Sequence, residues 1–301
     1  MYQLVFFYQL EMQIMEWFYK IGNEALNVIF YLISQLGGSI VLIALLGIIY
    51  WCFDKEKGER IGFTILSSIC LNGVIKTLVN FKRPFQYEGK EYLQKLKDSK
   101  LSDSATGSSF PSGHSQNTGA LYTSIALQFK KKWLWIVTVI ILILVPISRL
   151  YLGVHFPSDV IVGLLLGIIN AIVMYYLFNY TKIKKQYIYL ISLIIFLPFT
   201  FLKGVEHDFA RGYGLLIGFV VGVCVENKFI RFKNDVSITK KFLRVLIGIL
   251  LVGGAYFLVG LIPDSVSHIT WVTIILHALI AFIAMGVVPF TFKSLKNPNG
   301  L

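Results

Sequence analysis

Arg149, His155 and Asp159 could act together chemically, because they lie in one short segment, 148–159, between two long apolar runs. Pro157 suits the first turn of a helix, which places Asp159 near the start of that helix and His155 just before it. A carboxylate on one imidazole nitrogen fixes the tautomer of the ring and leaves the other nitrogen free to act as a nucleophile. The Arg149 guanidinium presents a planar fork of donors to a phosphate or a carboxylate. For this segment alone, a helix cap beside an arginine that snorkels to a membrane boundary is the alternative.

A second basic cluster, Lys76, Lys82 and Arg83, closes the apolar segment 58–80. Lys76 and Arg83 are two helical turns apart, so we expect them to project from one face of a helix that ends at Pro84. Snorkelling at a membrane boundary is the alternative, and it suits Lys82 better than Lys76, which lies deeper in the apolar run.

A third cluster, Ser112, Gly113 and His114, comes directly before another apolar run. Ser112 is a candidate N-cap, and the backbone N–H groups that follow it would favour an anion at the start of a helix. Gly113 would let the backbone approach that anion closely. Alone, His114 is equally compatible with a polar residue at a helix start.

The composition indicates an integral membrane protein that must carry these clusters on membrane helices. The chain is 56% hydrophobic with a mean hydropathy of +0.70, whereas a soluble domain is about 45–50% apolar. The net charge of +12 does not indicate nucleic acid, because the basic residues form short clusters between apolar runs. Cys52, Cys70 and Cys224 show no pairing or metal-ligand spacing, so we expect three buried thiols. We expect no cleavable signal peptide, since Glu11 and Glu16 interrupt the first apolar stretch.

The expected fold class is all-α, a polytopic membrane bundle of about nine transmembrane helices preceded by an N-terminal interfacial segment. Residues 1–36 are apolar but broken by charged side chains, which is typical of amphipathic helices in the membrane interface; a true span is the alternative. The nine apolar segments are 38–53, 58–80, 113–129, 134–150, 159–180, 187–203, 211–226, 244–263 and 271–291. The polar stretch 81–110 is too long for a simple connection, and such loops are usually functional or mobile.

Most Lys and Arg residues gather in alternate loops, which orients the chain. Such loops stay in the cytoplasm, so the loop after residue 80 and the connection that holds His155 should face outward. The basic loops hold Lys55, Lys57 and Arg60; Lys130, Lys131 and Lys132; Lys182, Lys184 and Lys185; Lys228, Arg231, Lys233, Lys240, Lys241 and Arg244; and Lys293 and Lys296. All three clusters then fall on one side of the membrane. Cations, a helix N-terminus and two histidines, one beside a carboxylate, would make a receptor for a phosphoryl group.

The set K-x6-R-P from Lys76, P-S-G-H from Pro111 and S-R-x5-H-x3-D from Ser148 resembles the three-part signature of the type-2 phosphatidic acid phosphatase family. That family shares its helical core with vanadium haloperoxidases and glucose-6-phosphatase. Every signature position is matched in order, and the resemblance covers about residues 38–180.

The resemblance implies that His155 attacks phosphorus to form a phosphohistidine, that Asp159 orients its imidazole, and that His114 protonates the leaving group and then activates water. It implies no metal and no cofactor. The phosphate-binding set that it implies is Lys76, Arg83, Ser112, Gly113 and Arg149, supported by Ser148.

The sequence therefore predicts a multi-pass plasma-membrane enzyme with an extracytoplasmic site and a cytoplasmic C-terminus. We expect an interfacial segment at 1–36, a catalytic core at 37–181 and a C-terminal extension of four helices at 182–301. The expected partners are a lipid phosphate or pyrophosphate and the bilayer, and not nucleic acid. A lipid-to-lipid phosphotransferase, a phosphatase of soluble sugar phosphates and a non-catalytic lipid-phosphate transporter are the alternatives. The C-terminal helices could form a homo-oligomer interface or a lateral wall of the lipid entrance.

Overall fold

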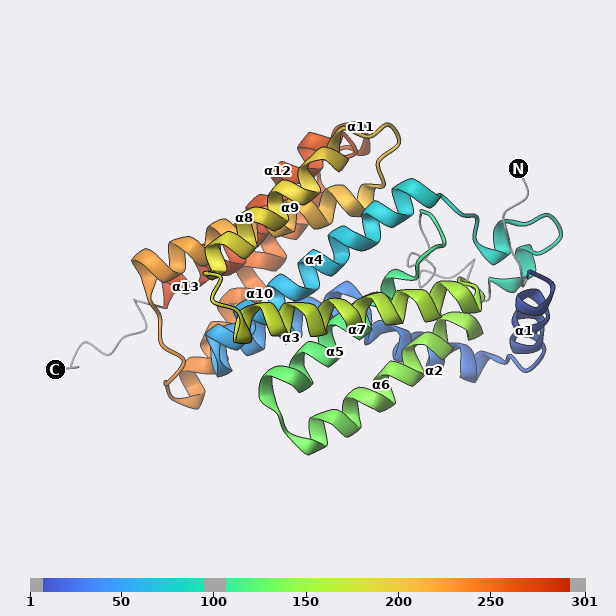
Figure 1. The fold of residues 1–301 in the computed structure, drawn as a ribbon, viewed down its shortest axis with the longest axis horizontal. Coiled ribbons are helices and arrows are strands. Elements are labelled where there is room, and N and C mark those ends of the chain that lie inside the picture. Colours follow the sequence, from blue (N-terminus) through green and yellow to red (C-terminus); the bar gives the residue numbers. More distant parts are fainter. Residues whose placement is uncertain (1–7, 95–106, 293–301) are drawn as a thin grey trace. The chain divides into compact units, whose positions relative to one another are not determined.

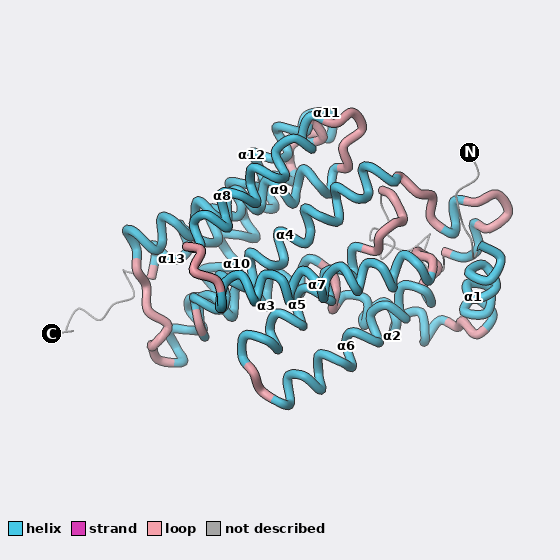
Figure 2. The backbone as a smooth tube through the Cα atoms, viewed as in Figure 1, coloured by secondary structure: helices cyan, strands magenta, loops and turns pink. Residues whose placement is uncertain are grey.

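The computed structural model describes residues 8–94 and 107–292, and within those ranges the chain forms helices joined by loops, without a strand (Figure 2). The expected all-α fold class is confirmed. Parts of three expectations lie outside the described residues: the ends of the N-terminal and C-terminal segments, 1–7 and 293–301, with Lys293 and Lys296, and residues 95–106 of the long polar loop.

Six helical stretches of the described chain are long and apolar enough to cross a membrane, and a bent pair formed by α2 (Glu24–Gln35) with Ser39–Phe53 would make a seventh. The expected count of nine is not confirmed. The segment 113–129 forms α5 (Gly113–Phe129), which has 17 residues and buries polar side chains. Most of 187–203 lies in the shorter apolar helix Lys185–Phe201. The six stretches are Lys55–Gln86, Lys132–Tyr151, Pro157–Tyr180, His207–Ile230, Ile238–Gly260 and Thr270–Thr291.

The chain divides into two compact units, Met1–Leu42 with Leu71–Tyr176, and Ile43–Cys70 with Leu177–Leu301. Helix α4 (Lys55–Val79) contributes its end to the first unit and its beginning to the second. The domain boundaries expected from the sequence, after residues 36 and 181, stay a prediction.

In the first unit, close helix packing depends on glycine. Helix α5 lies against α7 (Pro157–Tyr180), and a Cβ on Gly167 would come within 2.1 Å of the Gln116 carbonyl oxygen. A Cβ on Gly163 would come within 2.6 Å of the Ser112 carbonyl oxygen. Small residues let membrane helices approach to backbone contact, so these glycines bring the start of α5 against the first turns of α7.

Helix α6 (Lys132–Tyr151) packs against α5 and α2 in the same unit (Figure 1). The N-terminal segment forms two helices, α1 (Tyr8–Lys20) and α2. The short helices η2 (Pro84–Gln86) and η3 (Glu91–Leu93) follow α4, and Leu93 packs with Met12 and Met15 of α1. Helical structure at 1–36 is thus observed for its described part, and its place in the membrane interface stays a prediction.

The second unit is built around α9 (His207–Val225) and α12 (Thr270–Phe282). A Cβ on Gly218 would come within 1.9 Å of the Ala278 carbonyl oxygen, so here too glycine permits close contact. The remaining elements include α3 (Ser39–Ile48), which straddles the unit boundary, and η1 (Ile49–Phe53), α8 (Lys185–Phe196), η5 (Leu197–Phe201), η6 (Glu226–Ile230), α10 (Ile238–Gly260), α11 (Asp264–Ser267), η7 (Ile283–Val287) and α13 (Val288–Thr291).

The three cysteines are free thiols. Cys52 and Cys70 are buried, whereas Cys224 is exposed, which corrects the expectation of three buried thiols. A helix that faces lipid can expose a cysteine without contact to water, and a hydropathy pattern does not separate that position from a packed one.

Candidate active site

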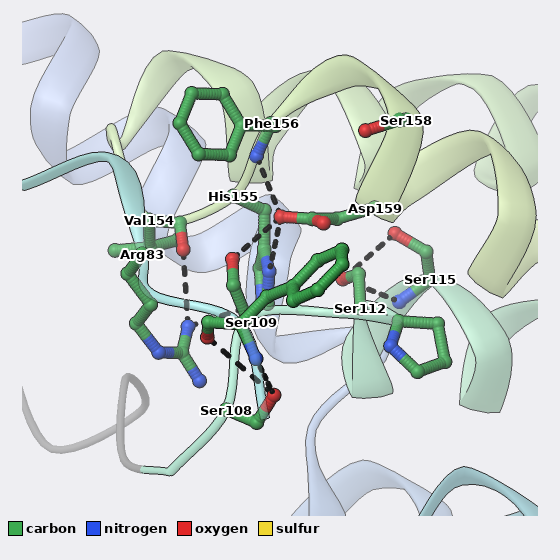
Figure 3. A network of polar contacts seen from close by, with 12 residues as sticks. Arg83, Ser108, Ser109, Ser112, Ser115, Val154, His155, Phe156, Ser158 and Asp159 are labelled. Carbon is green, nitrogen blue, oxygen red and sulfur yellow. Dashed lines mark hydrogen bonds and ion pairs between the residues drawn. The ribbon is translucent and has the colours of Figure 1, made fainter. Parts of the chain in front are cut away.

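All three sequence clusters contribute to one network of polar contacts in the first unit (Figure 3). The Arg83 Nη1 atom lies 3.2 Å from His155 Nε2, which joins the basic cluster at 76–83 to the segment 148–159. The Ser112 backbone N–H donates to the Asp159 carbonyl oxygen at 3.0 Å, which joins the cluster at 112–114 to the same segment. The elements that the glycine contacts bring together therefore deliver the predicted residues to one place.

His155 lies in the turn between α6 and α7, two residues before Pro157, which begins α7 as expected. Gly153 shapes this turn with a φ of +75°, and a Cβ there would lie 1.7 Å from the Leu93 carbonyl oxygen. Only glycine combines that conformation with that close approach. The turn buries the His155 side chain, which is 2% exposed.

The two ring nitrogens of His155 face groups of opposite charge. Nδ1 lies 3.5 Å from Asp159 Oδ2, and Nε2 lies 3.2 Å from the Arg83 guanidinium. Because a guanidinium can only donate, Nε2 accepts, so the proton of the neutral ring sits on Nδ1 and faces Asp159. Burial and the nearby cations Arg83, Arg149 and Lys76 hold the pKa of His155 well below its ordinary value. The ring is therefore neutral, and its Nε2 lone pair is directed at the Arg83 guanidinium.

Asp159 is held by two donors besides its contact with His155. Its Oδ2 accepts from the Ser109 hydroxyl at 2.5 Å and from the Phe156 backbone N–H at 2.8 Å (Figure 3). Both bonds favour the charged carboxylate and fix its plane. Ser109 was not predicted from the sequence, and its only signal there is its position directly before the Phe110–Pro111 pair.

Arg83 is 2% exposed and its side chain donates to the carbonyl oxygens of Gly107 (3.1 Å) and Val154 (3.0 Å). Lys76 and Arg83 were expected to project from one helical face, and the structure contradicts this. Helix α4 ends at Val79, and Asn80 takes a left-handed conformation with a φ of +46°. A residue before proline avoids the helical conformation, so Arg83 is extended and reaches His155 from a loop instead.

Lys76 and Arg149 are also buried, at 4% and 0% exposure. Arg149 Nη1 donates to the Ser34 hydroxyl of α2 at 2.5 Å. Ser148 donates to the Val145 carbonyl oxygen at 2.6 Å within α6. That bond ties its hydroxyl to its own helix, and its predicted support of the phosphate-binding residues stays a prediction.

Ser112 is the N-cap of α5, as predicted: its hydroxyl accepts from the Ser115 backbone N–H at 3.5 Å and from the Ser115 hydroxyl at 3.1 Å. Gly113 is the first residue of the helix and faces the Asn72 side chain. Asn72 in turn donates to Gln116 Oε1 at 2.8 Å and to the Pro111 carbonyl oxygen at 3.3 Å. The buried, hydrogen-bonded side chains of Asn72 and Gln116 fix the start of α5 against α4 near Lys76.

His114 follows in the first turn of α5 and is half-buried. Arg149, Lys76 and Arg83 all act on it electrostatically, so it shares the surroundings of His155. Another residue that the sequence analysis did not place here is Glu11 of α1, whose Oε1 accepts from the Ser158 backbone N–H at 2.8 Å. The first turn of α7 thus carries one carboxylate of its own and receives a second from α1.

Within residues 8–94 and 107–292, no group of three or more His, Cys, Asp or Glu side chains could hold a metal ion. The chemistry that the described site offers is that of buried cations, oriented backbone donors, two imidazoles and a carboxylate. Such a set suits an anion with a reactive centre next to His155 Nε2.

Comparison with known proteins agrees with this description. The chain is 38% identical over 118 residues to an undecaprenyl-diphosphatase of Sulfolobus acidocaldarius, covering 37% of this chain and 52% of the relative. It is 46% identical over 70 residues to phosphatidylglycerophosphatase B of Bacillus subtilis, covering 20% and 34%. It is 29% identical over 174 residues to undecaprenyl-diphosphatase BcrC of Bacillus subtilis, covering 56% and 82%. The chain thus spans about half and about a third of the length of the first two.

Among solved structures, the chain resembles a PAP2 type phosphatidylglycerolphosphate phosphatase from Bacillus subtilis, with 26% identity, a TM-score of 0.46 and coverage of 59% of this chain and 89% of that one. Residues 59–183 match the PAP2 superfamily, and residues 210–299 match the transmembrane extension of PAP2 superfamily phosphatases. The first match contains all three clusters of the site. The chain is therefore a member of the PAP2 superfamily.

Proposed function

We propose that this protein is a membrane phosphatase that hydrolyses a lipid phosphate or pyrophosphate at the extracytoplasmic face through a phosphohistidine. One observation carries the proposal: His155 presents a neutral Nε2 to Arg83 while its other nitrogen faces Asp159. A phosphoryl oxygen that binds Arg83 would bring its phosphorus within reach of that lone pair. The undecaprenyl-diphosphatases and the phosphatidylglycerophosphatase among the relatives support a lipid substrate.

In the first step, His155 Nε2 attacks phosphorus and the bond from phosphorus to the leaving oxygen breaks. His114, protonated once the bound anion offsets the nearby cations, gives its proton to that oxygen and becomes neutral, and Asp159 balances the positive charge that the His155 imidazole acquires. In the second step, His114 takes a proton from water, the water oxygen attacks phosphorus, and the phosphorus–nitrogen bond breaks to release phosphate and neutral His155. Lys76, Arg83 and Arg149, with the Ser112 hydroxyl and the Gly113 amide, offset the charge on the phosphoryl oxygens.

The proposed face follows from the alternate basic loops, which assign the turn that holds His155 to the outside. A boundary site would let the lipid chain stay in the bilayer while its phosphate reaches the buried cations. We propose a polyprenyl pyrophosphate or a general lipid phosphate as the substrate class. The C-terminal helices would form a lateral wall of the lipid entrance or a homo-oligomer interface.

The test is phosphate release by the purified protein in detergent with EDTA. The substrates are a polyprenyl pyrophosphate, phosphatidic acid, phosphatidylglycerol phosphate and a sugar phosphate. His155→Ala should abolish release, and His277→Ala is the matched control, because His277 is also buried but its Nδ1 lies 2.8 Å from the Thr273 carbonyl oxygen in the second unit. Equal release by wild type and His155→Ala would overturn the nucleophile. No release from any substrate would favour phosphotransfer, which a lipid with a free hydroxyl would reveal, or transport.

A further inference from the structure

The hydrogen bond between Ser34 and Arg149 joins the N-terminal helices to the site. The two side chains are 115 positions apart in the sequence, both are fully buried, and Arg149 Nη1 lies 2.5 Å from Ser34 Oγ. A guanidinium has no acceptor, so the Ser34 oxygen accepts from it. Hydrogen bonds to a charged group are roughly twice as strong as those between neutral groups. Ser34 therefore restrains the plane of the Arg149 guanidinium.

Restraining that plane matters because the donors of a guanidinium form a rigid fork. Once one N–H is directed at Ser34, the directions of the others follow from the planar geometry. Arginine also loses rotamer freedom when it binds an anion, and a side chain that is already fixed loses less. A buried hydroxyl acceptor can thus orient Arg149 before the phosphoryl group arrives.

Ser34 is itself held by the helix that carries His114. A Cβ on Gly37 would lie 2.6 Å from the His114 carbonyl oxygen and 2.5 Å from the Thr118 hydroxyl, so the end of α2 touches the first turns of α5. The Tyr122 hydroxyl of α5 donates to the Leu36 carbonyl oxygen at 3.0 Å. These contacts lie within three residues of Ser34 and leave its backbone little freedom.

The other side of α2 is fixed to the helix that carries Arg149. Tyr151 donates to Asn27 Oδ1 at 3.0 Å, and its ring stacks on Phe30 with centroids 4.2 Å apart. Helix α2 therefore bridges the start of α5 and the end of α6, and its Ser34 side chain touches a predicted phosphate ligand directly.

We propose that Ser34 is a positioning residue of the phosphate site, which acts by orienting the Arg149 guanidinium. The inference rests on the proposed function. It extends the site to a residue outside the 59–183 match to the PAP2 superfamily.

The variant Ser34→Ala tests this proposal by steady-state kinetics and inhibition by inorganic phosphate. We expect kcat/KM to fall about tenfold and the phosphate inhibition constant to rise about tenfold, which is the loss of one modest oriented contact. The matched control is Thr138→Val, which removes a buried hydroxyl of α6 that bonds to the Tyr122 carbonyl oxygen at 3.2 Å, and it should leave both constants within twofold of wild type. A lower melting temperature with unchanged kcat/KM and inhibition constant would show a merely structural role and overturn the proposal.

A double-mutant cycle with Arg149→Lys tests whether Ser34 acts through Arg149. Lysine lacks the planar fork, so Ser34→Ala should change kcat/KM less than twofold in that background. A tenfold loss in both backgrounds would overturn the proposal. If Ser34→Ala does not fold, Ser34→Cys replaces it, because a thiol is a weak acceptor of similar shape.

Calorimetric titration with inorganic phosphate separates this inference from the proposed function, since it needs no turnover. If the wild type releases phosphate from no substrate yet binds phosphate, weaker binding by Ser34→Ala and not by Thr138→Val would uphold the inference while the proposed function fails. Equal binding by wild type and Ser34→Ala would overturn the inference alone. A wild type that neither releases phosphate from any substrate nor binds phosphate would overturn both.

Discussion

The two compact units bury charge of opposite sign. In the described part of the first unit, the buried ionic side chains are Lys76, Arg83 and Arg149 against Glu11 and Asp159. Among the second unit's residues up to 292, they are Glu59 and Glu226 against Arg244. Burying a charge is costly unless something compensates for it. The two units differ in what compensates their buried charge.

In the second unit, each buried acid has a basic partner on its own unit. Glu226 accepts from the Lys55 ammonium at 2.9 Å, and Glu59 lies 2.7 Å from that of Lys185. The two lysine side chains are 24% and 38% exposed, so they reach the acids from the surface. Glu59 also accepts from the Tyr189 hydroxyl at 2.5 Å. This arrangement is typical of a structural polar cluster, in which the protein supplies the compensation.

In the first unit, the cations are themselves buried, and they converge with two histidines. Arg83 reaches His155, and Arg149 reaches Ser34, which is neutral. An excess of buried positive charge is what an anionic ligand would balance on binding. Burial of charge alone therefore does not indicate a functional site. An excess of buried cations beside two histidines does indicate one.

The largest expected contrast comes from the same substitution in both units. Arg149→Lys should lower kcat/KM about a hundredfold or more, because one donor to a transition-state charge is worth about 10²–10³ in rate. Arg244→Lys should leave kcat/KM unchanged and lower the melting temperature, because Arg244 donates to the carbonyl oxygens of Trp51 (2.8 Å) and Lys233 (2.9 Å). Phosphate release and thermal unfolding check both variants. If Arg149→Lys lowered the melting temperature but kept full activity, the two arginines would not differ in role.

Removing an acid from the second unit should affect stability alone. Glu226→Gln should lower the free energy of unfolding by about 2 kcal/mol, less than the 3–5 kcal/mol of a fully buried pair, since Lys55 is partly exposed. Denaturant unfolding in detergent measures the change, and Glu56→Gln, an exposed acid of the same unit, is the control. A specific activity that falls while the protein stays folded would contradict a purely structural role for this cluster.

Ser109→Ala should lower kcat about tenfold with a small change in stability. The variant removes the hydroxyl that donates to Asp159 Oδ2 at 2.5 Å, so the carboxylate that faces His155 is less firmly oriented. The matched control is Ser124→Ala, another buried serine of the same unit. Single-turnover kinetics check it, and an equal loss in both variants would remove Ser109 from the site.

The pH dependence should show the depressed pKa of His155. Because burial and Arg83, Arg149 and Lys76 lower that pKa, the acid limb of kcat/KM should lie below pH 6.5. Arg83→Gln removes one of these cations, so the pKa should rise and the limb should move up toward pH 6.5. A limb that stays in place would mean that Arg83 does not act on the nucleophile.

The depressed pKa of His155 also determines how the free energy of unfolding changes with pH. A histidine that stays neutral in the folded protein is protonated in the unfolded chain below pH 6.5, so the unfolded state binds more protons there. The free energy of unfolding should therefore fall as the pH drops below 6.5. Unfolding of wild type and His155→Ala at pH 7.5 and 5.5 measures this, and the pH-dependent loss should be smaller in the variant.

The smallest effect is expected at the surface pair of Glu16 and Lys90, whose atoms are 2.6 Å apart. The pKa of the Glu16 carboxyl is lowered by its hydrogen bond from Lys90, yet both side chains are about one-third exposed, so water and salt screen the pair. Glu16→Gln should change kcat/KM less than twofold. A larger loss would show that α1 depends on this pair for its place beside the site.

The motif residues could be predicted because their chemistry is local. A few consecutive residues are enough to predict the cap at Ser112, the start of α7 at its proline, and the spacing of His155 and Asp159. Ser34, Ser109 and Glu11 could not be found in this way, because each is a lone polar residue that the tertiary fold brings to its partner. Glu11 in particular interrupts an apolar run, which indicates an amphipathic helix, and the structure uses it at the start of α7 instead.

Two other predictions were wrong or unconfirmed for physical reasons. Arg83 was expected on a helical face because a seven-residue spacing fits a helix, but Asn80 and Pro84 end the helix before it. The count of nine spans relied on apolar runs, and such runs do not separate a lipid-facing helix from a short one such as α5, which buries Gln116 and Thr118. Hydropathy measures how readily a side chain leaves water, and it does not tell whether that side chain then contacts lipid or another helix.

The contact between Glu11 and Ser158 joins residues 147 positions apart, and that between Ser34 and Arg149 joins residues 115 apart. During synthesis the chain grows from its N-terminus, so α1 and α2 emerge long before either partner exists. Until the ribosome has made α6 and the start of α7, Glu11 and Ser34 must be accommodated by other groups. Biosynthesis therefore cannot complete this site one motif at a time. Its assembly is a late event, in which two helices made early contact segments made more than a hundred residues later.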